Sequence, residues 1–169
     1  MEARAVAFWI DDPKKVTKKQ MDAWAKDFDN WATVDGTCNY LFARTPFAYE
    51  KAVEWAVKKP EFVKRAGFTM MACLAVHDKE AEDEKLAEFL PIIEKYADDD
   101  RNFVKKAVNW ALRQIGKRSL NLNKLAVETA ERIKLQNTRS ARWIASDALR
   151  ELKSPKALER LTKKRGSAR

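Results

Sequence analysis

Apolar residues recur three and four positions apart along the chain, and no segment alternates apolar with polar residues. Such spacing places apolar side chains on one face of an α-helix, whereas a half-buried strand needs alternation with a period of two. Only 4 glycines occur in 169 residues, so few positions favour the tight turns that connect short strands. The pattern therefore predicts an all-α protein.

Capping residues and prolines mark where the predicted helices begin. Thr17 is a candidate N-cap for the second helix, and Asp29 or Asn30 for the third, because their side-chain oxygens can accept from free backbone N–H groups. Pro46 and Pro60 stand where two further helices open, since the first helical turn does not use the missing N–H. The predicted helices cover residues 2–10, 18–28, 31–42, 47–59, 61–79, 83–97, 101–117, 123–136, 139–153 and 155–164.

Two short sequences recur at a similar interval. FVKRA at 62–66 resembles FVKKA at 103–107, which lies 41 residues later, and ALRQI at 111–115 resembles ALREL at 148–152, which lies 37 residues later. A period of about 40 residues with two helices per period is typical of HEAT-like repeats, whose helix pairs stack into a curved solenoid. We therefore expect a HEAT-like or ARM-type helical repeat solenoid, an α-α superhelix. The alternative is chance similarity among basic amphipathic helices.

Length and composition fit one domain without disulfides or metal. We expect a single domain over residues 1–169, with residues 164–169 as a basic disordered tail. Cys38 and Cys73 form no Cys-x-x-Cys pair, and with the single histidine, His77, they are too few soft ligands for zinc, so we expect no metal and no cofactor. The sequence lacks a long apolar run and a signal-like start, which predicts a cytoplasmic protein that does not enter a membrane.

The positive charge lies in the C-terminal part of the chain. Residues 101–169 carry 19 Lys or Arg and 5 Asp or Glu side chains, whereas residues 1–100 carry 15 and 20. A basic excess of this kind suits a polyanion such as nucleic acid, but a solvated helical surface produces the same composition. Charge alone leaves both interpretations open.

The segment NWATVDGTC at 30–38 and the segment NWALRQIGKR at 109–118 carry the candidate chemistry. In a helix, Trp31 and Asp35 share a face, as do Trp110 and Arg113, and their helices should line the concave side of the solenoid. Tryptophan beside arginine on a basic surface suits a nucleic-acid backbone, although tryptophans at helical spacing are more often core residues. Asp35 fits the core interpretation poorly, because a half-buried carboxylate without a partner costs free energy.

These segments resemble a known family. WATVD at 31–35, KRA at 64–66 and FVKKAVNWALRQIGK at 103–117 are similar, in order and separation, to motifs of the AlkD-type DNA alkylation repair glycosylases. The resemblance covers roughly residues 2–155. It implies a HEAT-like solenoid that grips duplex DNA in a basic channel and hydrolyses the N-glycosidic bond of cationic N3- or N7-alkylated purines, without a metal or cofactor and with the lesion left in the duplex.

The resemblance also implies roles for particular residues. Asp35 would be the catalytic carboxylate, and Trp31 and Trp110 would flank the damaged nucleotide. Arg65 and Arg113 would hold the phosphate backbone. We expect further DNA contacts from four basic residues: Lys64, Lys106, Arg139 and Arg142.

The sequence departs from the family pattern near its start. Family members carry further helices before the point that matches Met1, so we expect N-terminal repeats to be missing. Gly36 directly follows Asp35 and should weaken that helix. We expect a monomer, with a dimer through the exposed apolar face of helix 2–10, which carries Phe8 and Trp9, as the alternative.

Three functions remain open from the sequence. The first is a DNA glycosylase for alkylated purines, which the set of tryptophan, aspartate and arginine residues favours. The second is a DNA-binding repeat protein of the same family without excision activity. The third is a helical-repeat scaffold for an acidic protein partner, which needs no such set of residues.

Overall fold

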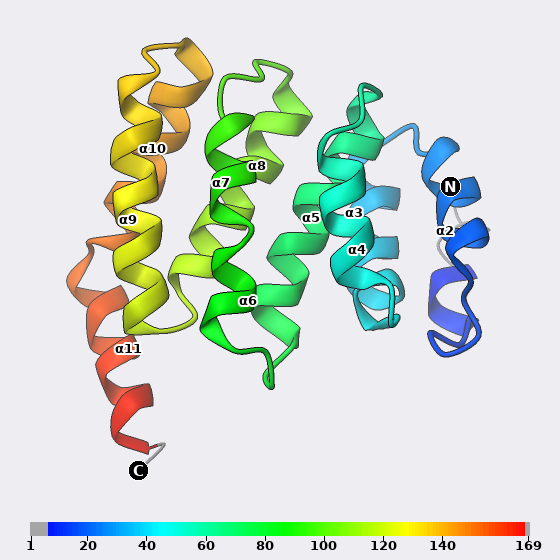
Figure 1. Cartoon of the computed structure of the whole chain (residues 1–169), viewed down its shortest axis with the longest axis horizontal. Helices are drawn as coiled ribbons and strands as arrows, with labels where there is room; N and C mark the ends of the chain where they lie inside the picture. The colour runs from blue at the N-terminus through cyan, green and yellow to red at the C-terminus, as the bar shows by residue number, and fades with distance from the viewer. Residues whose placement is uncertain (1–6, 168–169) are drawn as a thin grey trace.

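The computed structural model describes residues 7–167, with side chains as far as Lys163, and between these residues it contains helices and no strand. Residues 7–10 are helical, so the first predicted helix is seen only in part, because residues 2–6 lie outside the described residues. The all-α prediction is confirmed (Figure 1). The other elements are α2 (Lys18–Lys26), α3 (Trp31–Tyr40), η1 (Phe42–Arg44), α4 (Ala48–Ala56), α5 (Glu61–His77), α6 (Asp83–Ala87), α7 (Leu90–Lys95), α8 (Asn102–Gly116), α9 (Leu120–Leu135), α10 (Arg139–Leu152) and α11 (Pro155–Ser167).

The helices begin where the capping residues predict. The Thr17 hydroxyl accepts from the Gln20 N–H at 3.2 Å before α2, and Asn30 Oδ1 accepts from the Thr33 N–H at 2.9 Å before α3. Both contacts satisfy a backbone donor that has no partner within the helix. Pro60 directly precedes α5, as expected.

Several predicted segments differ in the structure. The helix predicted over 83–97 is divided into α6 and α7, because Pro91 in the first turn of α7 has no N–H with which to continue α6. The helix predicted to reach residue 42 ends at Tyr40, and a short 3-10 turn follows it. The tail predicted to be disordered is helical as far as Ser167, where α11 ends, and residues 168–169 lie outside the described residues.

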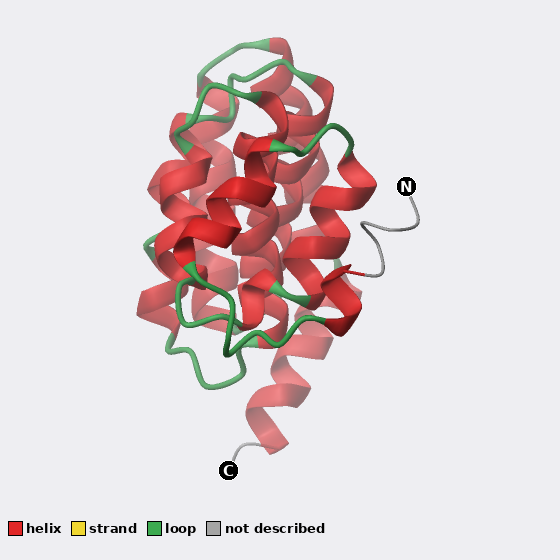
Figure 2. Cartoon of the chain, turned by 90° about the vertical axis from the view of Figure 1, so that its right-hand side faces the viewer, coloured by secondary structure: helices red, strands yellow, loops and turns green. Residues whose placement is uncertain are grey.

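The helices form two layers of a repeat stack. Helices α3, α5, α8 and α10 pack side by side in one layer, and α4, α7 and α9 cover it (Figure 1). Viewed from the N-terminal end, successive helix pairs lie behind one another, and α11 extends beyond the stack (Figure 2). Trp31, Arg65 and Trp110 all lie in the α3/α5/α8/α10 layer, which is the layer predicted to bind DNA.

The N-terminal end of this layer packs more closely than the sequence predicts. Helix α3 runs unbroken through Gly36, and a Cβ added at that position would lie 2.6 Å from the Phe8 ring. A larger residue at position 36 would therefore require the Phe8 ring to shift. Phe8 is buried, which contradicts the expectation that it is exposed, whereas Trp9 is exposed and packs against Tyr40 with the two rings tilted and their centroids 4.0 Å apart. Between residues 7 and 167, no helix combines the length and apolar content that crossing a bilayer requires.

Candidate nucleic-acid interface and catalytic carboxylate

Helix α3 presents Trp31 and Asp35 on one face. Trp31 is the first residue of the helix and is 52% exposed. Asp35 follows one turn later and is half buried, with a side chain 22% exposed. The predicted juxtaposition of an aromatic surface and a carboxylate is therefore present in the structure.

Asp35 is held by two residues of α5. The Arg65 guanidinium donates from Nε to Asp35 Oδ1 at 3.0 Å and from Nη2 to Asp35 Oδ2 at 2.7 Å. The Thr69 hydroxyl donates to Oδ1 at 3.2 Å. A bidentate arginine pair is among the strongest side-chain contacts and sets the orientation of the carboxylate. The free-energy cost of an unpaired buried carboxylate is therefore avoided at Asp35.

Arg65 is buried, and its guanidinium contacts other parts of the protein rather than solvent. Its third contact is a hydrogen bond from Nη1 to the Phe103 carbonyl of α8 at 2.7 Å, and the residue is only 6% exposed. A guanidinium that is buried and engaged in this way has little surface to offer a phosphate. The direct phosphate contact predicted for Arg65 is thus not supported by its position, which connects α3, α5 and α8.

Lys64 is also a structural residue. It is 8% exposed, its ammonium donates to Asp99 Oδ2 at 3.1 Å, and it lies 4.4 Å from the centroid of the Tyr96 ring. Burial of an ammonium is tolerated when a carboxylate and an aromatic face compensate for lost hydration. The prediction that Lys64 contacts DNA conflicts with this burial.

On α8, Trp110 and Arg113 lie one turn apart, as predicted. Trp110 is half buried against the core. Arg113 donates from Nη1 to Asp147 at 3.0 Å and from Nε to Glu151, both on α10. Its side chain is 31% exposed, so part of the guanidinium remains accessible beside two carboxylates. A phosphate at Arg113 would have to share the guanidinium with them.

Glu151 belongs to the same charge network. Lys117 donates to its Oε1 at 2.8 Å, and Arg113 donates to its other oxygen. Burial raises the pKa of Glu151, but the hydrogen bond and charge of Lys117 and the charge of Arg113 outweigh burial, so the pKa lies below its usual value. The carboxylate is therefore charged at neutral pH and competes with an incoming anion.

Three other predicted basic residues are exposed. Within the described residues, no hydrogen bond or ion pair holds the side chain of Lys106 or of Arg139. Arg142 is exposed and donates from Nη1 to Asn137 Oδ1 at 2.6 Å. All three lie on α8 or α10, so their positions fit the expected phosphate contacts better than that of Lys64.

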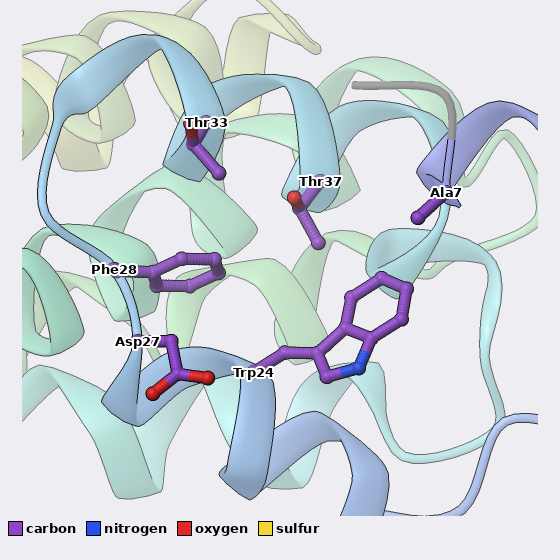
Figure 3. A pocket seen from close by; sticks show the side chains of 6 residues that line it. All are labelled: Ala7, Trp24, Asp27, Phe28, Thr33 and Thr37. Carbon is purple, nitrogen blue, oxygen red and sulfur yellow. The ribbon is translucent and has the colours of Figure 1, made fainter. Parts of the chain in front are cut away.

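A separate pocket of about 140 Å³ lies on the other side of α3. Figure 3 shows the Trp24 indole and the Phe28 ring on one side of the pocket and the side chains of Thr33 and Thr37 of α3 on the other. Asp35 and Trp31 do not line this pocket. The sequence signal was the i, i+4 spacing of Trp24 and Phe28, which sequence reasoning did not single out. The candidate carboxylate therefore does not belong to this pocket.

Helix pairs stacked in two layers are typical of a HEAT-like repeat protein. The sequence profile described as "DNA alkylation repair enzyme" matches residues 1–152, and the chain belongs to this family. A comparison with curated proteins found no match.

Among solved structures, the chain is similar to one described as "a new family of proteins related to the HEAT-like repeat DNA glycosylases with affinity for branched DNA structures". The TM-score is 0.69 at 20% sequence identity, and the match covers 89% of this chain and 70% of that chain. At this identity the likeness establishes the HEAT-like fold.

Proposed function

We propose that this protein is a DNA glycosylase that hydrolyses the N-glycosidic bond of cationic N3- or N7-alkylated purines in duplex DNA. The observation that carries the proposal is the Asp35 carboxylate, oriented by Arg65 and Thr69, one helical turn from the exposed indole of Trp31. Membership of the DNA alkylation repair family supports the same reaction.

The chemistry needs one carboxylate. An alkylated purine already carries a positive charge, so the base takes the electron pair of the C1′–N bond and leaves as a neutral molecule without a general acid. The deoxyribose becomes oxocarbenium-like in the transition state, and a fixed negative charge beside it lowers the barrier. Water then adds to C1′ and gives up a proton. Asp35 would stabilise the sugar cation and orient this water.

The surroundings of Asp35 suit this role. Arg65 and Thr69 hold the carboxylate in one orientation, so little reorganisation is needed when charge develops on the sugar. Arg65 also offsets part of the negative charge, which weakens the stabilisation that Asp35 supplies. The exposed Trp31 indole offers a surface for the sugar or base of the lesion.

DNA would lie along the α3/α5/α8/α10 layer. Lys106, Arg139 and Arg142 would contact phosphates, because all three are exposed on α8 or α10. Arg113 would join them by sharing its guanidinium between Glu151 and a phosphate. Trp110, half buried beside Arg113, would contact the nucleotide only through its exposed part.

A second candidate is a DNA-binding protein without excision activity. The bidentate pairing of Asp35 with Arg65 favours it, because the same contacts would form in a purely structural aspartate. The similar solved structure, described as having affinity for branched DNA, fits this function as well.

Base release from duplex DNA with a single N7-methylguanine separates the two candidates. We expect the wild type to release the base and Asp35→Asn to do so at least about 100-fold more slowly. An oriented charge can stabilise a transition state by several kcal/mol. Asp22→Asn is the matched control, because Asp22 is also a half-buried, paired aspartate but lies on α2. Thermal melting must show both variants folded at the assay temperature.

Equal release by the wild type and Asp35→Asn would exclude a catalytic role for Asp35. A wild type that binds the duplex without releasing base would establish the second candidate.

A further inference from the structure

The Trp-x-x-x-Asp pattern of α3 occurs a second time in the same layer. WATVD at 31–35 has a counterpart in WIASD at 143–147 on α10. The spacing of four places each tryptophan and its aspartate on one helix face. Helices α3 and α10 lie toward opposite ends of the α3/α5/α8/α10 layer (Figure 1).

The second pattern has the surroundings of the first. Asp147 Oδ2 accepts from Arg113 Nη1 at 3.0 Å, as Asp35 accepts from Arg65. The two aspartate side chains are similarly exposed, 18% and 22%. Trp143 is 41% exposed, close to the exposure of Trp31. Each end of the layer therefore presents an open indole beside a carboxylate that an arginine of a neighbouring helix holds.

The surroundings of Trp143 and Asp147 are more basic than those of Trp31 and Asp35, and Asp147 is less available for catalysis. Lys105 Nζ lies 5.7 Å from the centroid of a Trp143 ring, and Arg150, which is largely exposed, also donates to Asp147. Asn109 donates to the same carboxylate at 2.7 Å. Three donors share the Asp147 charge, so this aspartate is suited to positioning arginines and not to stabilising a sugar cation.

We propose that Trp143, with Lys105, Arg113 and Arg150, is a second nucleotide-contact site, which takes an unpaired nucleotide of the bound DNA. The proposal rests on the proposed DNA-binding function. The open indole stacks on a base, and the cations around it contact the flanking phosphates. Only a base that is unstacked from its neighbours in the duplex can stack on the face of a tryptophan. Such stacking has no strong preference for one base over another.

Fluorescence anisotropy with two DNA probes tests the site. One probe is a blunt duplex of about 16 base pairs, and the other is the same duplex with a single-stranded tail of about five nucleotides, enough to reach past one stacked base. We expect the wild type to bind the tailed probe more tightly. Trp143→Ala should lose roughly tenfold in affinity for the tailed probe and little for the blunt one, since the stacking of one base on the indole is lost.

Two further variants separate stacking from folding. Trp143→Phe should keep most of the preference for the tail, because it retains an aromatic face. Leu135→Ala is the control for loss of an exposed apolar side chain, since Leu135 is 81% exposed at the end of α9 in the other layer, and it should bind like the wild type.

The outcomes distinguish this site from the proposed function. If the wild type binds both probes equally and Trp143→Ala matches it, the second site is excluded while DNA binding stands. If the wild type binds neither probe, the proposed DNA-binding function fails and the second site with it. A preference for the tail that survives in Trp143→Ala and is lost in Trp31→Ala would assign the unpaired nucleotide to α3 and overturn the proposal.

Discussion

Arg65 is the residue on which the candidate site depends most. Its three hydrogen bonds join Asp35 of α3 to the Phe103 carbonyl of α8 through α5. A charge that is buried with its partner contributes little net stability, but removal of one partner leaves the other charge buried and uncompensated. The orientation of Asp35 and the packing of three helices therefore rely on one guanidinium.

Replacement of Arg65 should thus mainly lower the free energy of unfolding, with a smaller effect on DNA contacts. We expect Arg65→Ala to lower the free energy of unfolding by about 3 kcal/mol, as is typical when one partner of a buried ion pair is removed. Urea denaturation at neutral pH measures the change. Arg160→Ala, at an exposed position on α11, serves as the control and should be neutral. A fully stable Arg65→Ala variant with weakened DNA binding would restore the phosphate role that the sequence predicted.

Two lysines in matching sequences show what the sequence cannot predict at this scale. Lys64 in FVKRA and Lys105 in FVKKA occupy the same position of the repeated segment. Lys64 is buried against Asp99, whereas Lys105 is partly exposed beside Trp143. The difference comes from the loop before α8 and from α10, which lie tens of residues away in the chain. Local spacing placed these residues on the predicted helices, but burial and partners depend on contacts between helices.

At the scale of elements, the loop between α7 and α8 connects two repeats through Asp99. This carboxylate accepts from Lys64 of α5 at 3.1 Å and from Arg101 Nε at 2.9 Å. Burial raises the pKa of Asp99, but the hydrogen bonds from Arg101 and Lys64 outweigh it, so the pKa lies below its usual value. Arg101 in turn donates to the Lys59 carbonyl at 2.8 Å, which connects the loop to the start of α5.

The lowered pKa of Asp99 predicts how stability depends on pH. A carboxyl whose pKa is lower when folded stabilises the protein above its unfolded pKa of about 4, and this stability is lost as the pH falls through the folded pKa. We expect Asp99→Asn to be less stable than the wild type by about 2 kcal/mol at neutral pH, because Lys64 loses its buried partner. As the pH falls through the lowered pKa of folded Asp99, the stabilities of the two proteins should converge.

Chemical denaturation between neutral and acidic pH measures this dependence. Asp100→Asn is the control, since Asp100 is the exposed neighbour of Asp99, and it should follow the wild-type curve. A constant difference between Asp99→Asn and wild type at every pH would show that the ion pairs of Asp99 do not produce its effect.

Helix order and helix pairing were largely predictable. Thr17, Asn30 and Pro60 are local signals whose effect does not depend on distant contacts, and the boundaries they predict agree with the structure. The break between α6 and α7 was missed because the apolar spacing of 83–97 continues past it, although Pro91 marks it in the sequence. Nothing local showed that Arg65 would meet Asp35, since 30 residues separate them.

For the whole molecule, the basic excess of residues 101–169 lies mainly on and around α8 to α11. Part of it is already neutralised within the protein, since Asp147 and Glu151 engage Arg113, Lys117 and Arg150. Arg113 and Arg150 would therefore share their charge between these carboxylates and a phosphate, so less charge is available to DNA than the net charge of +9 suggests. Exposed residues such as Lys106 should account for most of the DNA affinity.

DNA affinity should fall with salt in proportion to the phosphates neutralised. With about four to six phosphate contacts, log K should decrease against log salt with a slope of roughly −4 to −5. Lys106→Ala should reduce this slope by about one unit, because one contact is lost. Binding titrations between low and physiological salt measure both slopes. Lys124→Ala, at an exposed position on α9, should leave the slope unchanged, and a flat response in the wild type would favour a scaffold for a protein partner.

Two buried thiols, one on α3 and one on α5, provide a way to measure how these helices separate. Burial raises the pKa of Cys38 well above its usual value, and burial together with the charge of Asp35 raises the pKa of Cys73 to about 12. Neither thiol can react with an alkylating reagent while the helices stay packed, since reaction requires an accessible thiolate. The rate of thiol labelling should therefore follow separation of α3 from α5, the two helices that the contacts of Asp35 with Arg65 join.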